Sequence, residues 1–154
     1  MSKVFNTSFE TSLRAMLILA QYKNEAKSVD MIAAIDFTTI YGSSMGYTDT
    51  DLHGQNSFGF SEYAARRELI ANALKDLVMR GVACIERTRD GVLYKISKDG
   101  FDKTVIPLCM KNEFAMAYMD SLSKVIRFVK GKTEQQIIAK INEKTTRKTG
   151  GFNG

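Results

Sequence analysis

Apolar residues recur every three to four positions in four stretches of the chain, the pattern of helices with one buried face. These stretches are residues 9–22, 29–40, 61–78 and 112–129. Ser28 is placed to cap the second helix and Ser61 the third, because a serine side chain accepts a hydrogen bond from the first turn. Gly81 is expected to end the third helix in a left-handed conformation. The pattern predicts a mainly helical chain.

Two short strands are expected after the third helix. Residues 82–86 and 92–96 have strand-type sequences, with an Arg89-Asp90-Gly91 segment between them that is typical of a tight turn. Helix, strand, turn and strand in this order predict a winged helix-turn-helix. The fold class we expect is mainly α with a small β-wing, extended by C-terminal helices.

The helix at residues 61–78 has an outer face of mixed charge. Its apolar stripe consists of Ile70, Ala73, Leu74, Leu77 and Val78, and the opposite face consists of Ala65, Glu68, Asn72, Lys75 and Asp76. A recognition helix in the DNA major groove normally presents basic or amide side chains. This face therefore argues against a simple repressor.

Arg66 and Arg67 flank the apolar stripe of the same helix and are expected to be partly buried. Each would then pair with a carboxylate, either Asp49 or Asp51 from the preceding loop or Glu62 from the start of the helix, because an unpaired buried guanidinium is costly. The alternative is that the two side chains bind a partner chain or a phosphate, which suits their planar forks of donors.

Residues 41–60 form a glycine-rich segment longer than the connection of an ordinary helix-turn-helix, and such segments are usually functional or disordered. It contains Asp49, Asp51 and His53, the only histidine. A metal, hydrolase or nuclease centre would require these groups to gather in space, whereas a lone loop histidine is more often a hydrogen-bonding residue. The sequence has no Walker-type phosphate loop. We therefore expect no enzyme activity, metal or cofactor.

The C-terminal part is expected to contain two further helices. Pro107 should break the chain within residues 101–110, ahead of the helix at 112–129. That helix has a broad apolar stripe at Phe114, Tyr118, Leu122, Val125, Ile126 and Val129. The stripe is a candidate interface with another chain, including a second copy, and the alternative is packing against the first helix inside the monomer. A last helix begins at Thr133, with Gln136 completing a capping box.

The positive charge of the chain is concentrated near its C-terminus. The net charge is +5, and residues 101–154 carry 10 basic and 5 acidic side chains. We expect a winged-helix domain at residues 1–130 and a basic helix with a flexible tail at 131–154. Candidate nucleic-acid contacts lie on the wing and in this helix: Arg87, Arg89, Lys140, Lys144, Arg147 and Lys148. A solvated basic tail that binds nothing is the alternative.

The length of 154 residues and the 44% apolar content are sufficient for one sizeable core. No stretch of the sequence has the length of a membrane span or the pattern of a signal peptide, so we expect a cytoplasmic protein. Cys84 and Cys109 have no metal-ligand spacing around them and are expected to be reduced core residues.

Several short blocks are scattered between residues 4 and 122: Phe5 to Glu10, Leu13-Arg14, Asp36, Tyr41-Gly42, Gly46, Leu52-His53-Gly54, Glu62, Arg66 to Ile70, Gly81-Val82, Gly91 and Tyr94. Together these blocks resemble the middle components of bacterial ABC-type three-component systems. The resemblance implies a small non-enzymatic adaptor beside a large SMC-like ATPase and an effector protein, acting in defence against phage or plasmids. It supplies no catalytic residues, and it leaves the basic helix from Thr133 to Lys148 outside the matched part.

Two functions therefore stay open. The first is an adaptor that holds together an ATP-driven, DNA-associated complex and contacts DNA without sequence preference. The second is a winged-helix transcription regulator that binds operator DNA as a dimer. A neighbouring gene for a long coiled-coil ATPase would favour the first, and sequence-specific operator binding would favour the second.

Overall fold

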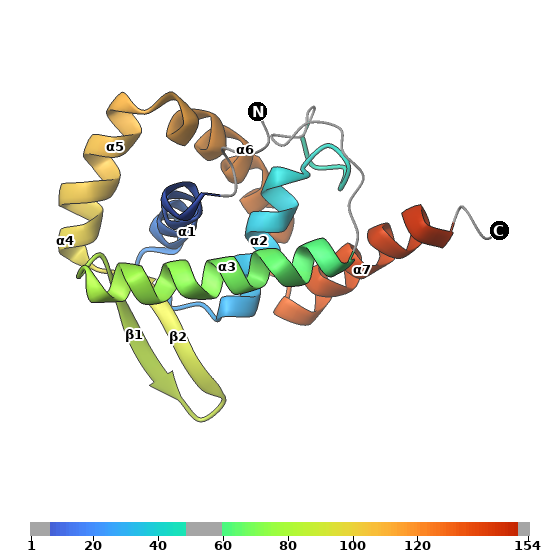
Figure 1. Cartoon of the computed structure of the whole chain (residues 1–154), viewed down its shortest axis with the longest axis horizontal. Coiled ribbons are helices and arrows are strands. Elements are labelled where there is room, and N and C mark those ends of the chain that lie inside the picture. Colours follow the sequence, from blue (N-terminus) through green and yellow to red (C-terminus); the bar gives the residue numbers. More distant parts are fainter. Residues whose placement is uncertain (1–6, 49–59, 151–154) are drawn as a thin grey trace.

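The computed structural model describes residues 7–48 and 60–150, apart from the side chains of residues 60, 61 and 145–150. This part of the chain is mostly helical, with one two-stranded antiparallel sheet (Figure 1). The elements are α1 (Ser8–Tyr22), α2 (Val29–Ile40), α3 (Phe60–Met79), β1 (Ala83–Thr88), β2 (Gly91–Ile96), α4 (Lys98–Gly100), the π-helical turn η2 (Phe101–Val105), α5 (Ile106–Lys111), α6 (Glu113–Val129) and α7 (Glu134–Gly150).

The first three helices lie where the apolar periodicity predicts them. Ser28 caps α2, since its Oγ accepts a hydrogen bond from the Met31 amide at 3.0 Å. The prediction for α3 was wrong by one residue at its start: the helix begins at Phe60, so Ser61 lies inside the first turn and is not the cap. Local hydrogen bonding and periodicity thus account for these elements.

The predicted hairpin is confirmed. β1 and β2 pair in register from Ala83 opposite Ile96 to Thr88 opposite Gly91, which leaves a two-residue turn at Arg89 and Asp90. Gly81 ends α3 with a φ of 76°, a conformation that glycine adopts without strain. The hairpin also pairs with the α1–α2 connection, where the amides and carbonyls of Lys27 and Tyr94 exchange two hydrogen bonds of 2.8 Å.

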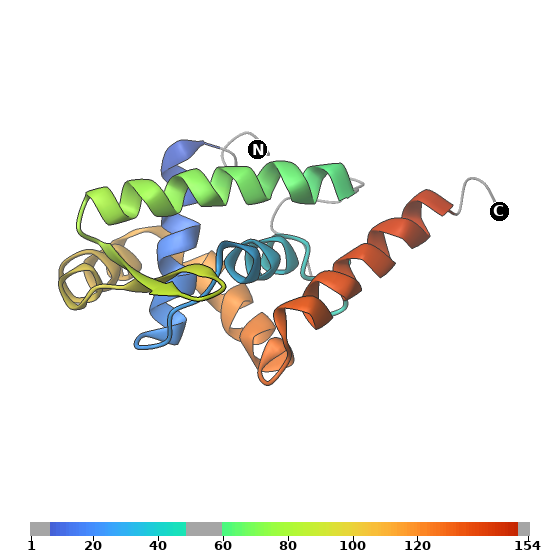
Figure 2. The same ribbon diagram turned by 90° about the horizontal axis from the view of Figure 1, so that it is seen from below.

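The core surrounds α1, which Figure 1 shows nearly end-on between α2, α3, α5 and α6. A continuous run from Ala15 to Leu19 is buried on this helix, because apolar residues occupy all of its central faces. Of the apolar stripe predicted on α3, Ile70, Ala73, Leu74 and Leu77 are buried, and Val78 is partly buried against the core. In Figure 2, α3 crosses one end of α1 and α2 is seen end-on beside it.

The break expected at Pro107 is not observed. Helical turns run from Lys98 to Lys111, and the chain turns only at Asn112, which adopts extended dihedrals and caps α6. Pro107 lies in the first turn of α5 and directly follows the wider turn of η2. A proline has no backbone N–H to donate to the carbonyl four residues earlier. It is tolerated at this position because neither the first turn of a helix nor a π-helical turn requires that hydrogen bond.

The apolar stripe of α6 is buried by the chain's own helices. Tyr118, Leu122 and Val125 are 0% exposed, and α6 packs against α2, α1 and α5. These three residues belong to the core, so the interface expected on the stripe is not available at them. Phe114 and Ile126 are partly buried against the same core. The packing alternative within the monomer accounts for the stripe.

Helix α7 joins the same core and then extends beyond it. The capping box is confirmed, since Gln136 Oε1 accepts from the Thr133 amide at 2.8 Å and Thr133 Oγ1 accepts from the Gln136 amide at 3.2 Å. Ile137 and Ile141 are buried, and α7 packs on α2 and α3. In both views its C-terminal end projects away from the other helices (Figures 1 and 2). Within the described residues, no helix is long and apolar enough to cross a membrane.

Candidate interaction surfaces

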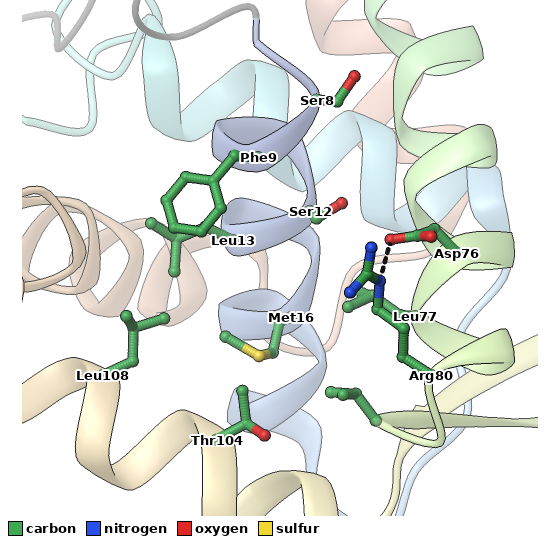
Figure 3. A pocket seen from close by; sticks show the side chains of 11 residues that line it. Ser8, Phe9, Ser12, Leu13, Met16, Asp76, Leu77, Arg80, Thr104 and Leu108 are labelled. Carbon is green, nitrogen blue, oxygen red and sulfur yellow. Dashed lines mark hydrogen bonds and ion pairs between the residues drawn. The ribbon is translucent and has the colours of Figure 1, made fainter.

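A groove of about 400 Å³ lies between α1, the C-terminal half of α3 and the η2–α5 segment (Figure 3). Its apolar lining consists of Phe9, Leu13, Met16, Leu77, Val82 and Leu108. In Figure 3, Phe9 and Leu13 lie on the side of α1 that faces Leu108 of α5. The groove was not predicted, because three segments distant in the sequence form it.

The polar rim of the groove contains an ion pair between Arg80 Nε and Asp76 Oδ2 at 2.9 Å. A second hollow of about 340 Å³ between α1 and α3 shares these two residues and includes Leu69. Phe9 is 63% exposed and Leu69 is 38% exposed. An exposed phenylalanine beside an apolar groove is a feature of protein-binding surfaces, since its burial by a partner removes apolar area from water.

Arg66 lies in a buried contact with two residues from α3 and the end of α2. Its Nε is 3.4 Å from Glu62 Oε1, and its guanidinium carbon lies 5.7 Å from the centre of the Tyr41 ring. The Tyr41 hydroxyl donates to the same Glu62 oxygen. Burial and this hydrogen bond raise the pKa of Tyr41. Arg66 is 3% exposed, so this side chain holds α3 against α2.

Arg67 pairs with Asp30 in the first turn of α2, a partner that was not predicted from the sequence. Its Nε and Nη2 donate to the two carboxylate oxygens of Asp30, the second at 3.2 Å. The hydrogen bond with Asp30 raises the pKa of Arg67. The two side chains are 43% and 40% exposed, so the pair is a surface fork that ties α3 to α2.

A second polar cluster is fully enclosed by the core. Arg14 Nε donates to Asp36 Oδ1 at 2.8 Å, and the Tyr118 hydroxyl donates to the same oxygen at 2.6 Å. The side chains of Arg14 and Asp36 are 0% exposed. Asp36 interrupts an otherwise apolar stripe in the sequence, and the structure explains its position: it links α2 to α1 and α6.

The environment of this cluster favours a charged arginine and a neutral tyrosine. Burial alone would lower the pKa of Arg14, but the charge of Asp36 reverses this effect and raises it. Burial, with the charge of Asp36, raises the pKa of Tyr118 well above its ordinary value. The cluster is thus a fixed ion pair with a hydroxyl donor, which is suited to orienting three helices.

The candidate nucleic-acid contacts lie on two separate elements. Arg87 and Arg89 are exposed on the hairpin. Lys140 and Lys144 are half-buried on α7, and the Lys140 ammonium lies 4.1 Å from the centre of the Tyr47 ring. The side chains of Arg147 and Lys148 lie outside the described residues.

The predicted loop cluster falls outside the described part of the chain. Asp49, Asp51 and His53 belong to this segment, so the pairing of Asp49 or Asp51 with Arg66 or Arg67 stays a prediction. Within residues 7–48 and 60–150, no group of three or more histidine, cysteine, aspartate and glutamate side chains has the arrangement of a metal site. Cys84 and Cys109 are free thiols and half-buried, and burial raises the pKa of Cys109.

The whole described chain matches one family. A family model described as the ABC-three component (ABC-3C) system Middle Component 2 matches residues 4–150. The chain belongs to this family. The resemblance seen in the sequence is thereby confirmed, and the match also includes α7, which the expected limit at residue 122 left out. No curated protein and no solved structure matches the chain.

Residues that carried the resemblance to the middle components meet in two places in the structure. Arg14 and Asp36 form the buried ion pair, although 22 positions separate them. Tyr41, Glu62 and Arg66 form the contact between α2 and α3. These residues therefore help to fix how α1, α2 and α3 pack.

Proposed function

We propose that this Middle Component 2 chain is a non-enzymatic adaptor that binds the large SMC-like ATPase of its three-component system. Membership of the family over residues 4–150 is the observation that carries this proposal. A middle component is one protein of an assembly, so binding another component is the simplest role for it. The wider role that we propose for the system is defence against phage or plasmids.

We further propose that α1, α2, α3 and the hairpin form a winged helix. Two observations support this assignment. The elements follow one another as helix, helix, helix and hairpin, and Lys27, between the first two helices, forms an isolated β-bridge with Tyr94 of the hairpin. Glu68 and Asn72 are exposed on the outer face of α3, and so are Ala65 and Lys75, which were predicted on the same face. This mixed face supports an adaptor more than an operator-binding regulator.

The surface that we assign to the ATPase is the groove between α1, α3 and α5, which no other described part of the chain fills. Phe9 is the most suitable anchor, because an exposed aromatic ring beside an apolar groove can become buried against a partner. The Arg80–Asp76 pair supplies polar contacts at the rim.

The test is co-expression of the tagged full chain with the ATPase encoded beside it, followed by affinity capture and size-exclusion chromatography. Wild-type chain should retain the ATPase in one peak. Phe9→Ser should reduce capture at least about tenfold, as expected when an aromatic hot spot is removed. Its melting temperature should stay near that of wild type, because Phe9 is 63% exposed.

Ile85→Ser is the matched control, since Ile85 is an exposed apolar residue on the hairpin, away from the groove. This variant should capture the ATPase like wild type. Failure of the wild-type chain to bind the ATPase would contradict the adaptor role. Full capture by Phe9→Ser would leave the adaptor role intact and contradict the assignment of the groove.

A further inference from the structure

The surface where α6 meets α7 contains a stacked aromatic pair in contact with a lysine. The rings of Tyr47 and Phe128 are stacked with centres 4.7 Å apart and planes 20° apart. Lys140 Nζ lies 4.1 Å from the centre of the Tyr47 ring. Tyr47 is 9% exposed, whereas Phe128 is 49% exposed. The buried ring thus supports the exposed ring from behind.

Helical spacing places further cations beside this pair. Lys124 precedes Phe128 by four residues on α6, and Lys144 follows Lys140 by four residues on α7, so each lies on the same side of its helix as its neighbour. We call these five residues the aromatic–basic strip: Tyr47, Lys124, Phe128, Lys140 and Lys144. The strip combines an exposed aromatic face with cations at both ends.

The charge of the chain is concentrated around the strip. Residues 124–144 contain six basic and two acidic side chains, and the net charge of the whole chain is +5. Arg127, Lys130 and Lys132 of this segment are exposed around the turn between α6 and α7. Lys124 pairs with Asp120 at 3.4 Å, an exposed contact that a phosphate can replace. The local field therefore attracts polyanions.

We propose that the aromatic–basic strip binds single-stranded nucleic acid, with a base stacked on Phe128 and the backbone phosphates beside the lysines. An aromatic face among cations is the combination by which single strands are held without sequence preference. Duplex bases are already stacked on one another and do not offer a face to an exposed ring. A purely electrostatic surface would not require Phe128 to stay half exposed in water.

This site lies on α6, α7 and the turn after α2, so it shares no residue with the groove assigned to the ATPase. It does not rest on the adaptor role. Lys140 and Lys144 are candidate contacts by sequence, whereas Tyr47 and Phe128 are not, because their stacking joins segments that lie far apart in the chain.

The test is fluorescence anisotropy of the full wild-type chain with a labelled thymidine 20-mer, a labelled duplex of equal length and labelled polyglutamate. At about 50 mM salt the single strand is expected to bind at least about tenfold more tightly than the other two. Phe128→Ala should weaken this binding by about 5- to 150-fold, the range for loss of one stacked base. Phe128→Trp should retain it, because indole also stacks on bases.

Two further variants separate stacking from charge and from folding. Met116→Ala is the matched control, since Met116 is also 49% exposed on α6 but lies outside the strip, and it should bind like wild type. Lys144→Gln should reduce the slope of log affinity against log salt by about 0.7, the contribution of one phosphate contact on a single strand. Melting curves of all variants exclude loss of folding.

Three results would overturn the proposal. Absence of binding to the 20-mer at low salt would show that the strip holds no nucleic acid. Equal affinity for single strand and duplex, together with no effect of Phe128→Ala, would reduce the surface to nonspecific charge. Polyglutamate binding as tight as that of the 20-mer would indicate an acidic protein as the ligand.

Discussion

Removal of the buried charge at Asp36 gives the sharpest test of how this core is held together. Asp36→Asn keeps the size of the side chain and removes its charge. Arg14, which is 0% exposed and donates to Asp36 at 2.8 Å, then loses its hydrogen-bonded counter-charge inside the core. Breaking a buried ion pair from one side costs about 3 to 5 kcal/mol. In a chain of this length, each kcal/mol shifts the melting temperature by about 2 to 4 °C.

The expected decrease in melting temperature for Asp36→Asn is therefore about 6 to 20 °C, measured by circular dichroism at 222 nm and paired with urea titration. Tyr118→Phe removes one hydrogen bond to the same carboxylate and should cost about 1.5 to 3 kcal/mol. Glu86→Gln is the control, because its 3.5 Å contact with Lys95 is half exposed, and it should leave the melting temperature unchanged.

A fully apolar replacement provides the second arm of the Asp36 test. The triple variant Arg14→Met, Asp36→Leu, Tyr118→Phe removes the three hydrogen-bonded side chains of the cluster together, so it should be more stable than Asp36→Asn alone, which leaves the arginine charge buried. If Asp36→Asn lowered the free energy of unfolding by less than about 1 kcal/mol, the reasoning would be refuted. That result would mean that the cluster is hydrated or that Arg14 finds another partner.

Two further predictions concern α3 and the tyrosines. Arg66→Ala should lower the free energy of unfolding by about 2 to 4 kcal/mol in urea titrations, because Arg66 is 3% exposed and packs against Glu62 and Tyr41. Arg67→Ala should lower it by less than about 1 kcal/mol, because the pair of Arg67 with Asp30 is exposed. A larger loss for Arg67→Ala than for Arg66→Ala would contradict the assigned burial. Stability should also fall at alkaline pH. Burial raises the pKa of Tyr22 and of Tyr63 to about 12, and an unfolded tyrosine has a pKa of about 10, so the folded state retains phenol protons that the unfolded state loses. The two protonated phenols contribute fully to the free energy of unfolding below pH 10, and this contribution is lost as the pH rises from about 10 to 12. Urea midpoints that stay constant across this range would contradict the prediction.

Features set by neighbouring residues were predictable from the sequence, and those set by packing were not. Ser28, Gly81 and the Arg89-Asp90 turn follow local hydrogen bonding and backbone preferences, so α2, the end of α3 and the hairpin lie where expected. Pro107 was misleading because the π-helical turn before it accommodates a proline inside a helical segment.

The partners of charged and apolar side chains required the folded chain. Arg67 and Asp30 are 37 positions apart, and Tyr118 and Asp36 are 82 positions apart, so no spacing rule joins them. The stripe of α6 was correctly read as apolar, but periodicity does not reveal whether another chain or α2 covers it. The same limit hid the groove at Phe9 and the stacking of Phe128 on Tyr47.

The two proposed surfaces predict that partner binding and nucleic-acid binding can be lost separately. Phe9 lies on α1 beside α5, whereas Phe128 lies on α6 and stacks on Tyr47. Substitutions at sites without shared contacts act independently. Phe9→Ser should therefore keep wild-type affinity for the thymidine 20-mer while losing the ATPase, and Phe128→Ala should show the opposite pattern. If either substitution abolished both activities in a protein with an unchanged melting temperature, the two ligands would share one surface, and the assignment of separate sites would be wrong.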